Sequence, residues 1–403
     1  MHLIYHQGRH INKPAADTNT KRYDVVVIGA GIQGAGIAQA AAVCGYKTLV
    51  IEKFPLPGMG TSCKSSKLIH GGLRYLESGQ FSLVRECLQE RKRLLKNAPE
   101  LVKLIPFYIP VYSNSSRPSW RIWLGLCIYS LFSLKPFEIV KKTQWPFLDN
   151  IQTKNLKHVF KYYDAQTDDQ LLTQSVAKSA QKFGAKFIYS AEFRSSELQQ
   201  ESHIIHYVKD EINNTIESKY LINCSGPWIE ETQKKIQPKL DIPAIELISG
   251  SHIIIDIITT QGAYYIETKD KRAVFVIPWK EKHTLIGTTE TAYTDTVDNI
   301  SATKKDINYL INTYNENFNT EISEKNIIDT FCGLRVLPEN NVSTFKKSRD
   351  SLIVESKSCP GLIALIGGKL TVYRASAERV ISKISTDKKR LRNNTRKIKL
   401  SID

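Results

Sequence analysis

Polar and charged side chains of several kinds gather in the stretch 61–77. It reads TSCKSSKLIHGGLRYLE and carries hydroxyl groups, cations, one histidine and one tyrosine. Almost three hundred positions further on, a second motif, GGKLT, occupies 367–371. Hydroxyl and cationic groups suit the binding of phosphate, and a histidine that titrates near neutrality can accept a proton. Together the two motifs predict a site where a redox cofactor faces a small anion.

A glycine motif, GAGIQG at 29–34, precedes the first of these stretches. It falls between an expected strand and an expected helix, where Gly29, Gly31 and Gly34 would let the backbone and the helix N-terminus approach a pyrophosphate. Glu52 lies 18 residues beyond Gly34, at the end of the next expected strand, where it can accept hydrogen bonds from ribose hydroxyls. The motif predicts a dinucleotide, but FAD and NAD share this ADP half.

The stretch after Glu52 favours a flavin. It begins with a proline and glycine bend at 55–60, which allows the following residues to wrap a pyrophosphate and a ribityl chain. We expect this path to bring His70, Gly71 and Gly72 beneath the flavin ring.

Six motifs, in their order and spacing, resemble the FAD-dependent glycerol-3-phosphate dehydrogenase family of the D-amino-acid-oxidase-like flavoproteins. They are SSKLIHGGLRYLE at 65–77, NCSGPW at 223–228, GSHIII at 250–255, FVIPW at 275–279, IGTTE at 286–290 and GGKLTVYR at 367–374. The resemblance covers about residues 22–385. It implies FAD as cofactor, oxidation of sn-glycerol 3-phosphate to dihydroxyacetone phosphate, and transfer of the electrons to a membrane quinone.

The resemblance also implies a set of substrate residues. They are His70, Arg74, Tyr75, Arg335, Lys369 and Thr371. A phosphate dianion suits the planar guanidinium groups of Arg74 and Arg335. Oxidation of the alcohol requires a base for its hydroxyl proton while hydride leaves for the flavin, and His70 is the first choice, with Lys369 or Tyr75 as alternatives. His252 is expected to be a wall residue, and no metal site is expected.

A second set of residues is expected to bind the FAD cofactor. GGKLT should begin a helix whose amides face the flavin pyrimidine, which is negative when reduced, and Ser225 with Gly226 should pack against the cofactor. The expected cofactor contacts are Gly29, Gly31, Gly34, Glu52, Thr61, Ser62, Ser65, Ser66, Lys67, His70, Gly71, Gly72, Ser225, Gly226, Gly368, Lys369, Leu370 and Thr371.

The chain departs from the family pattern at several places. GLRVL at 333–337 replaces the usual GVRPL, Glu290 stands where an aspartate is usual, and Lys64 adds a cation. By comparison with the family pattern we expect the chain to lack the usual C-terminal helical domain after the GGKLT helix, and a partner subunit or a homodimer could replace it. The alternatives are an oxidase or dehydrogenase of another small anionic alcohol, 2-hydroxy acid or amino acid, and a flavoprotein subunit without turnover.

These motifs require an α/β fold, in which a Rossmann-like, glutathione-reductase-type FAD domain is interleaved with a mostly antiparallel substrate sheet. We expect helices over 31–44, 81–96, 169–183, 303–318 and 370–384, and an irregular region over 100–160. Strands are expected over 23–29, 47–52, 186–191, 203–208, 220–224, 251–257, 273–277, 284–287 and 362–366.

The expected domains follow from these elements. The FAD domain comprises 22–105, 166–228 and 331–386, and the substrate domain comprises 106–165, which is membrane-proximal, and 229–330. An N-terminal tail, 1–21, and a basic C-terminal tail, 387–403, flank them.

The amino-acid composition limits the classes of molecule that the protein is expected to bind. The 403 residues carry a net charge of +16, which favours anionic partners, but the chain has no zinc-finger or RNA-recognition motif, so nucleic acid is not expected. The seven cysteines form no CxxC pair, which favours a reduced, cytoplasmic compartment.

Membrane association is expected to be peripheral, on the inner face of the membrane. The first 20 residues contain no apolar run, and the most apolar window, 120–132, is about 13 residues long, short of the roughly 20 that a spanning helix needs. Residues 388–399 contain seven basic residues and no acid, so this tail is expected to be solvated or to contact an anionic membrane.

Overall fold

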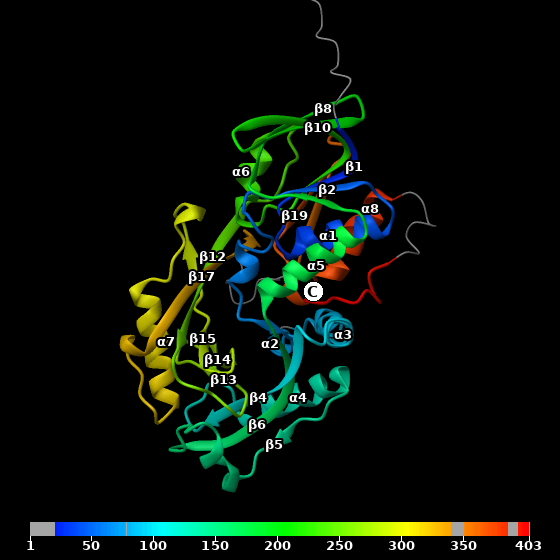
Figure 1. Ribbon diagram of the computed structural model, residues 1–403. Coiled ribbons are helices and arrows are strands. Elements are labelled where there is room, and N and C mark those ends of the chain that lie inside the picture. Colours follow the sequence, from blue (N-terminus) through cyan, green and yellow to red (C-terminus); the bar gives the residue numbers. More distant parts are fainter. Residues whose placement is uncertain (1–20, 78, 340–349, 386–393, 403) are drawn as a thin grey trace, which may run out of the picture.

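A computed structural model describes residues 21–77, 79–339, 350–385 and 394–402, without the side chain of Arg74. Two β-sheets stand one above the other in Figure 1, with helices packed on both. All but the last residue of the expected N-terminal tail lies outside the described residues.

The first sheet is parallel in its centre. Its parallel strands lie in the order β19, β10, β1, β2, β7. Their bounds are Leu362–Ile366, Ile212–Asn223, Lys21–Ile28, Thr48–Ile51 and Lys186–Ile188. Val25, Val26 and Val27 of β1 are completely buried, as expected of a strand covered on both faces. The sheet is extended by β8 (Ala191–Gln199), β9 (Ser202–Lys209), β11 (Ile236–Gln237) and β18 (Leu352–Glu355).

Helices cover one face of this sheet. They are α1 (Ile32–Val43), α5 (Asp169–Lys182) and α8 (Tyr373–Ile384), which follows η7 (Leu370–Val372). The other face packs against β8, β9 and α6 (Ile229–Lys234), which follows η3 (Gly226–Trp228).

The second sheet is almost entirely antiparallel. Its strands run in the order β16, β12, β15, β14, β13, β4, β6, β3, with β17 paired to β12 and β5 paired to β6. The bounds are Thr291–Tyr293, Ile245–Ile255, His283–Gly287, Ala273–Trp279, Ala263–Glu267, Val102–Tyr112, Leu156–Thr167, Leu68–Ile69, Ile327–Pro338 and Glu138–Ile139.

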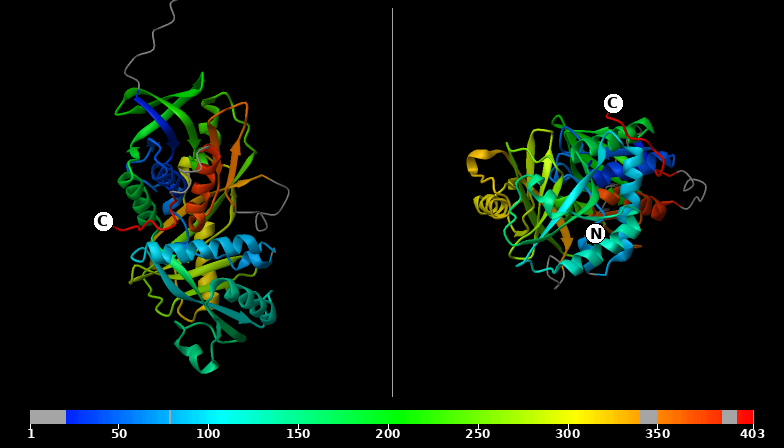
Figure 2. Two further views of the ribbon diagram at one scale, coloured as in Figure 1. Left: turned by 90° about the vertical axis from the view of Figure 1, so that its right-hand side faces the viewer. Right: turned by 90° about the horizontal axis from the view of Figure 1, so that it is seen from below.

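Helices pack on both faces of the second sheet. On one face lies α7 (Lys304–Asn317). On the other lie α2 (Arg74–Glu77), α3 (Phe81–Asn97) and α4 (Ser119–Ser133). Short 3-10 turns, η1 (Thr61–Cys63), η2 (Lys142–Phe147), η4 (Val297–Asn299) and η5 (Glu324–Asn326), join the remaining segments. Figure 2 shows α3 lying between the layers of the two sheets.

The expected fold class is confirmed, but the irregular region expected over 100–160 is wrong. It forms β4, α4 and the beginning of β6, which pair and pack in the second sheet. Strand β17 also extends the second sheet to Pro338, beyond the expected domain boundary at 330.

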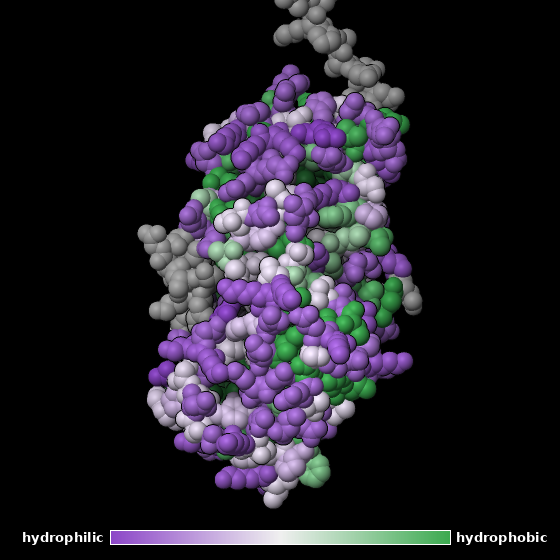
Figure 3. All heavy atoms as spheres, turned by 90° about the vertical axis from the view of Figure 1, so that its left-hand side faces the viewer, coloured by the Kyte–Doolittle hydropathy of each residue, from purple (hydrophilic) through white to green (hydrophobic). Residues whose placement is uncertain are grey.

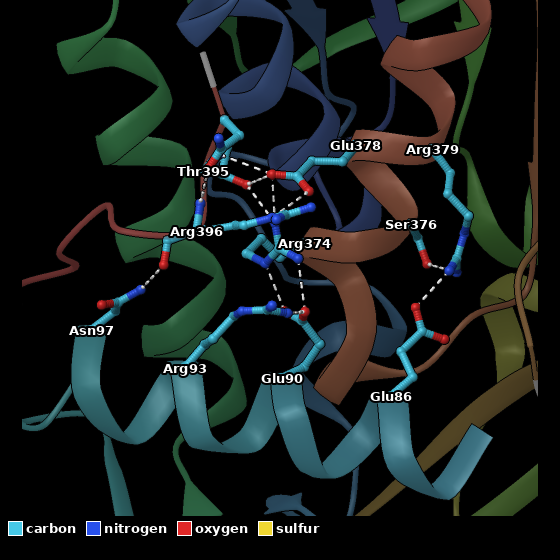
Figure 4. A network of polar contacts seen from close by, with 11 residues as sticks. Glu86, Glu90, Arg93, Asn97, Arg374, Ser376, Glu378, Arg379, Thr395 and Arg396 are labelled. Carbon is cyan, nitrogen blue, oxygen red and sulfur yellow. Dashed lines mark hydrogen bonds and ion pairs between the residues drawn. The ribbon is translucent and has the colours of Figure 1, made fainter. Parts of the chain in front are cut away.

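A buried ion network joins α3, α8 and the C-terminal segment (Figure 4). The Arg374 guanidinium donates to both carboxylate oxygens of Glu90, at 2.6 and 2.7 Å, and pairs with Glu378. Thr395 donates to Glu378 through its amide and hydroxyl. Because α8 begins just after the GGKLT motif, this network fixes that motif relative to α3.

The described part of the expected basic tail, residues 394–402, packs against the protein. The Leu400 amide donates to the Asn97 carbonyl at 2.8 Å, and the Leu400 side chain is 6% exposed within a core cluster. This segment is therefore not a freely solvated tail. The residues expected before it, up to 393, lie outside the described part of the chain.

One face of the molecule is mostly polar. On the face drawn in Figure 3, hydrophilic residues predominate and hydrophobic ones gather in smaller groups. Within the described ranges, no helix combines the length and the apolar character needed to cross a membrane. All seven cysteines are free thiols.

Candidate functional site

A cavity of about 900 Å³ lies between the two sheets. Residues from both sheets line it, including the carboxyl ends of β1, β2, β10 and β19, which meet at one edge. The predicted site residues that line it are Gly29, Gly31, Glu52, Thr61, Ser62, Ser65, Ser66, His70, Gly72, Tyr75, Ser225, Gly226, Arg335, Gly368, Lys369, Leu370 and Thr371.

The first turn of the parallel sheet packs closely against the end of β10 and lines the cavity. Gly29 has a φ of 97°, and a Cβ there would stand 2.7 Å from the Cys224 carbonyl oxygen, so only glycine fits. The α1 N-terminus opens into the cavity, and its Ile32 amide donates to Ser62 Oγ at 2.9 Å. This hydroxyl and the helix dipole suit a pyrophosphate.

Glu52 lies at the end of β2, as predicted. Its carboxylate accepts hydrogen bonds from the backbone amides of Ala30 and Phe54. Burial raises its pKa, although the two amide bonds act in the opposite direction. Since each carboxylate oxygen has a second lone pair, Glu52 can still accept a bond from a ligand hydroxyl in the cavity.

Three predicted cofactor residues are not among those that line the cavity. Lys67 is buried, and its ammonium donates to Asp169 at 2.6 Å and to the Cys63 carbonyl. Gly34 lies behind the turn, where a Cβ would stand 1.9 Å from the Gly29 oxygen. Gly71 donates its amide to the buried Tyr129 hydroxyl at 3.0 Å.

Each of these three residues therefore contacts other parts of the protein instead of the cavity. Lys67 was predicted for its positive charge, but Asp169, which also accepts from the amide and the hydroxyl of Ser65, neutralises that charge. Asp169 was missed as a residue that organises the predicted wrapping segment.

The two motifs that are far apart in sequence lie together. The His70 amide donates to Thr371 Oγ1 at 3.3 Å, and the Lys369 ammonium lies 4.0 Å from the centre of the Tyr75 ring. Lys369 Nζ is buried and has no hydrogen-bond partner among the described residues. A buried ammonium without such a partner is costly, and the role of Lys369 in binding an anion stays a prediction.

Arg335 reaches the cavity from β17. Its Nη1 lies 3.1 Å from Glu290 Oε1, and a Cβ at Gly250 would stand 3.3 Å from its Nη2. A second cavity arginine, Arg272, was missed; it donates to the Glu290 carbonyl, and its Nε and Nη2 both donate to Oδ2 of Asp270. The Arg74 backbone belongs to α2, but its side chain is outside the description.

His252 is a wall residue, as expected. Its Nε2 lies 2.9 Å from Ser66 Oγ, and its ring stacks on Phe331 with 4.7 Å between centroids. Burial, together with the cations Arg335 and Lys67, lowers its pKa to about 3. The ring is therefore neutral near pH 7.

This neutral histidine predicts an acid-sensitive fold. Below its unfolded pKa of about 6.5, the unfolded chain binds a proton that the folded protein refuses until about pH 3, so stability falls as pH drops through this window. At about pH 5 the loss is roughly 2 kcal/mol relative to about pH 7.5. Urea unfolding at both pH values measures this difference. The free energy of unfolding should fall less in His252→Gln than in the parent protein between the two pH values. His158→Gln, at an exposed position, is the control, and an equal loss in all three proteins would contradict the assignment.

Among the described residues, no three His, Cys, Asp or Glu side chains gather as a metal site.

Comparison with known proteins gives one consistent family. Residues 24–374 match the model of the FAD dependent oxidoreductase family. Aerobic glycerol-3-phosphate dehydrogenase from Escherichia coli is 35% identical over 375 residues, covering 90% of this chain and 73% of that protein. D-erythritol 1-phosphate dehydrogenase from Brucella abortus is 33% identical over 370 residues, covering 88% and 72%.

A solved structure agrees with these relatives. The glycerol-3-phosphate dehydrogenase from Bacillus halodurans, complexed with FAD, superposes with a TM-score of 0.72 at 27% identity; the match covers 90% of this chain and 64% of that one. The glycine turn and Ser62 at the α1 N-terminus line the cavity, and with the buried ammonium of Lys369 they fit a bound dinucleotide. The chain therefore belongs to the FAD-dependent oxidoreductase family, and its cofactor is FAD.

Proposed function

We propose that the protein oxidises sn-glycerol 3-phosphate to dihydroxyacetone phosphate and passes the electrons to a membrane quinone. The observation that carries the proposal is the grouping of Lys369, Arg335 and His70 around one cavity, two cations and a base. The named glycerol-3-phosphate dehydrogenases among the relatives support the choice of substrate.

Each of these residues has a role in the proposed reaction. Arg335 and Lys369 hold the phosphate dianion by charge-assisted hydrogen bonds. His70 accepts the proton of the secondary hydroxyl, so that the C–H electron pair can leave as hydride and the C=O bond can form. Bound FAD supplies the hydride acceptor, N5 of its ring.

The test is turnover of the FAD-loaded protein with a soluble dye as electron acceptor. Glycerol 3-phosphate should reduce the dye, whereas glycerol, lactate and D-alanine should not, because they lack the phosphate. Faster turnover with lactate or D-alanine would replace this proposal with the hydroxy-acid or amino-acid alternative.

A second candidate substrate is a longer phosphorylated polyol. The 33% identical relative named D-erythritol 1-phosphate dehydrogenase favours it. Both candidates need the same phosphate contacts and the same base, so their kcat/KM ratio in the dye assay decides between them.

Substitution of Glu290 is expected to change the affinity for the substrate. Its carboxylate lies beside Arg335, and its side chain is 11% exposed, so it competes with a substrate dianion for the guanidinium. Glu290→Gln removes the negative charge but keeps a hydrogen-bond acceptor. The KM for glycerol 3-phosphate should fall roughly three- to tenfold, about 1 kcal/mol for a partly screened pair.

The matched control for Glu290→Gln is Glu316→Gln. Glu316 lies on α7 and forms an exposed ion pair with Lys269. Its KM should equal that of the parent protein. A raised KM in Glu290→Gln would show instead that the carboxylate orients Arg335 for the substrate.

A further inference from the structure

The proposed base, His70, is followed by two glycines that give its backbone no stiffness of their own. Gly71 and Gly72 lie between β3 and α2, and Gly72 has a φ of 74°. Because glycine can adopt many backbone conformations, the place of His70 in the cavity must be fixed by contacts with other elements.

Two such contacts hold this segment from opposite sides of the chain. Thr371 of η7 accepts from the His70 amide at 3.3 Å and donates to the His70 carbonyl at 3.5 Å. Tyr129 of α4 accepts from the Gly71 amide at 3.0 Å. A Cβ at Gly71 would stand 2.5 Å from both the Tyr129 hydroxyl and the Leu88 side chain, so α4 and α3 press directly on this residue.

The Tyr129 hydroxyl is itself held by buried charged groups. It donates to Asp164 Oδ2 at 2.6 Å, and Arg91 Nη1 donates to Asp164 Oδ1 at 2.5 Å. The three side chains are 1%, 2% and 3% exposed for Tyr129, Asp164 and Arg91. A chain of hydrogen bonds, the Arg91–Asp164–Tyr129 chain, therefore runs through α3, β6 and α4, which pack together (Figure 1), and ends at Gly71.

The protonation of Tyr129 fixes the direction of these hydrogen bonds. Burial raises the pKa of its hydroxyl well above the ordinary value, and the carboxylate of Asp164 acts in the same direction. The hydroxyl therefore keeps its proton, donates to Asp164 and presents a lone pair to the Gly71 amide. It holds the segment and does not take up the proton of a substrate.

We propose that Tyr129 is a positioning residue, which together with Asp164 and Arg91 sets the place of His70 for proton transfer. This role rests on the proposed function, because it serves the base of that reaction. Asp164 also lines the cavity, where its ion pair with Arg91 offsets its negative charge beside an anionic substrate.

The experiment is anaerobic stopped-flow mixing of the FAD-loaded Tyr129→Phe variant with glycerol 3-phosphate. The substitution removes one hydroxyl, so the Gly71 amide and one Asp164 oxygen lose their bond to it. The rate of flavin bleaching at saturating substrate should fall about tenfold, because a small displacement of the base slows the chemical step far more than binding. The Kd from the same traces should change by less than about twofold.

The pH dependence of bleaching separates positioning from a direct part in proton transfer. His70 is chemically unchanged in Tyr129→Phe, so the rate should fall by the same factor at every pH and keep the limb that reports the base. Loss of that limb would make Tyr129 part of the proton path and would overturn the positioning role.

The matched control is Tyr264→Phe, on β13 of the same sheet. Tyr264 is completely buried, its hydroxyl donates to Asp149 at 2.7 Å, and it is not among the residues that line the cavity. This variant loses the same kind of hydrogen bond, but its bleaching rate should equal that of the parent protein.

Hydrogen exchange gives a readout that does not depend on turnover. Mass spectrometry of the peptide that contains Gly71 should show faster amide exchange in Tyr129→Phe than in the parent protein, and no change in Tyr264→Phe. Unchanged exchange in Tyr129→Phe would show that the hydroxyl does not hold this segment.

Three kinetic results would also overturn the proposal. They are a parent-like bleaching rate in Tyr129→Phe, a loss confined to Kd, and an equal loss of rate in Tyr264→Phe. A parent protein that glycerol 3-phosphate does not reduce would instead defeat the proposed function. The exchange comparison would then decide by itself whether Tyr129 fixes the segment that carries His70.

Discussion

Arg335→Ala is expected to lower kcat/KM for glycerol 3-phosphate by roughly 10- to 150-fold, through a higher KM, with FAD still bound. The reason is the loss of a charge-assisted contact to the phosphate, which contributes about 1.5–3 kcal/mol. The side chain is 26% exposed, so solvent screening favours the lower half of this range. Steady-state kinetics with a dye acceptor and the flavin content of the purified variant together measure the effect.

The control for this substitution is Arg22→Ala. Arg22 lies in an exposed ion pair with Glu217 at the start of β1, and its loss should leave both kinetics and flavin content unchanged. If Arg335→Ala loses its flavin and keeps its KM, Arg335 belongs to the cofactor site and the assignment of the phosphate site is wrong.

Arg374→Ala is expected to lower the free energy of unfolding by about 3–5 kcal/mol. The substitution leaves Glu90, a carboxylate that is 1% exposed, with Arg93 as its remaining ion-pair partner. The cost therefore lies toward the lower end of the range for removing one member of a buried pair. The substitution also frees Glu378, to which Thr395 of the C-terminal segment donates. Denaturant unfolding of the FAD-saturated protein gives the difference.

Lys383→Ala, on the same helix, is the matched control. Lys383 pairs with Glu355 at the surface, where both side chains are more than a third exposed, so its loss should cost at most about 1 kcal/mol. Equal destabilisation by the two substitutions would mean that the network in Figure 4 does not hold α8 against α3.

The parallel sheet was predictable because its signals are local. The run of valines in β1 and the glycines after it are adjacent in sequence. Valine by itself favours a strand, and glycine allows the tight turn that follows. Packing then brings the carboxyl ends of four strands to one edge, so residues such as Glu52 and Ser225 meet there as expected.

The second sheet was less predictable because its pairing is not local. Strand β4 contains Pro106 and Pro110, which usually argue against a paired strand, yet both are in register with β6. Helix α4 was missed because it is apolar on all sides and so lacks a helical period. The contacts that bury Leu126 and Tyr129 come from the fold and cannot be read from the local pattern.

The residues of the candidate site were also predictable only in part, because their partners are distant in sequence. Lys67 has the right type and spacing for a cofactor contact, but Asp169, 102 residues away, removes its charge from the cavity. Arg272 was missed because Asp270 and Lys271 beside it suggest only a charged turn. Sequence identifies the kind of side chain, whereas the partner that neutralises it depends on the fold.

The most direct test of the account is anaerobic titration of the FAD-loaded protein with glycerol 3-phosphate. We expect the visible absorption band of the oxidised flavin to bleach, and dihydroxyacetone phosphate to accumulate in a one-to-one ratio with reduced flavin. Flavin that stays oxidised in the presence of glycerol 3-phosphate, but bleaches with a 2-hydroxy acid or an amino acid, would contradict the account.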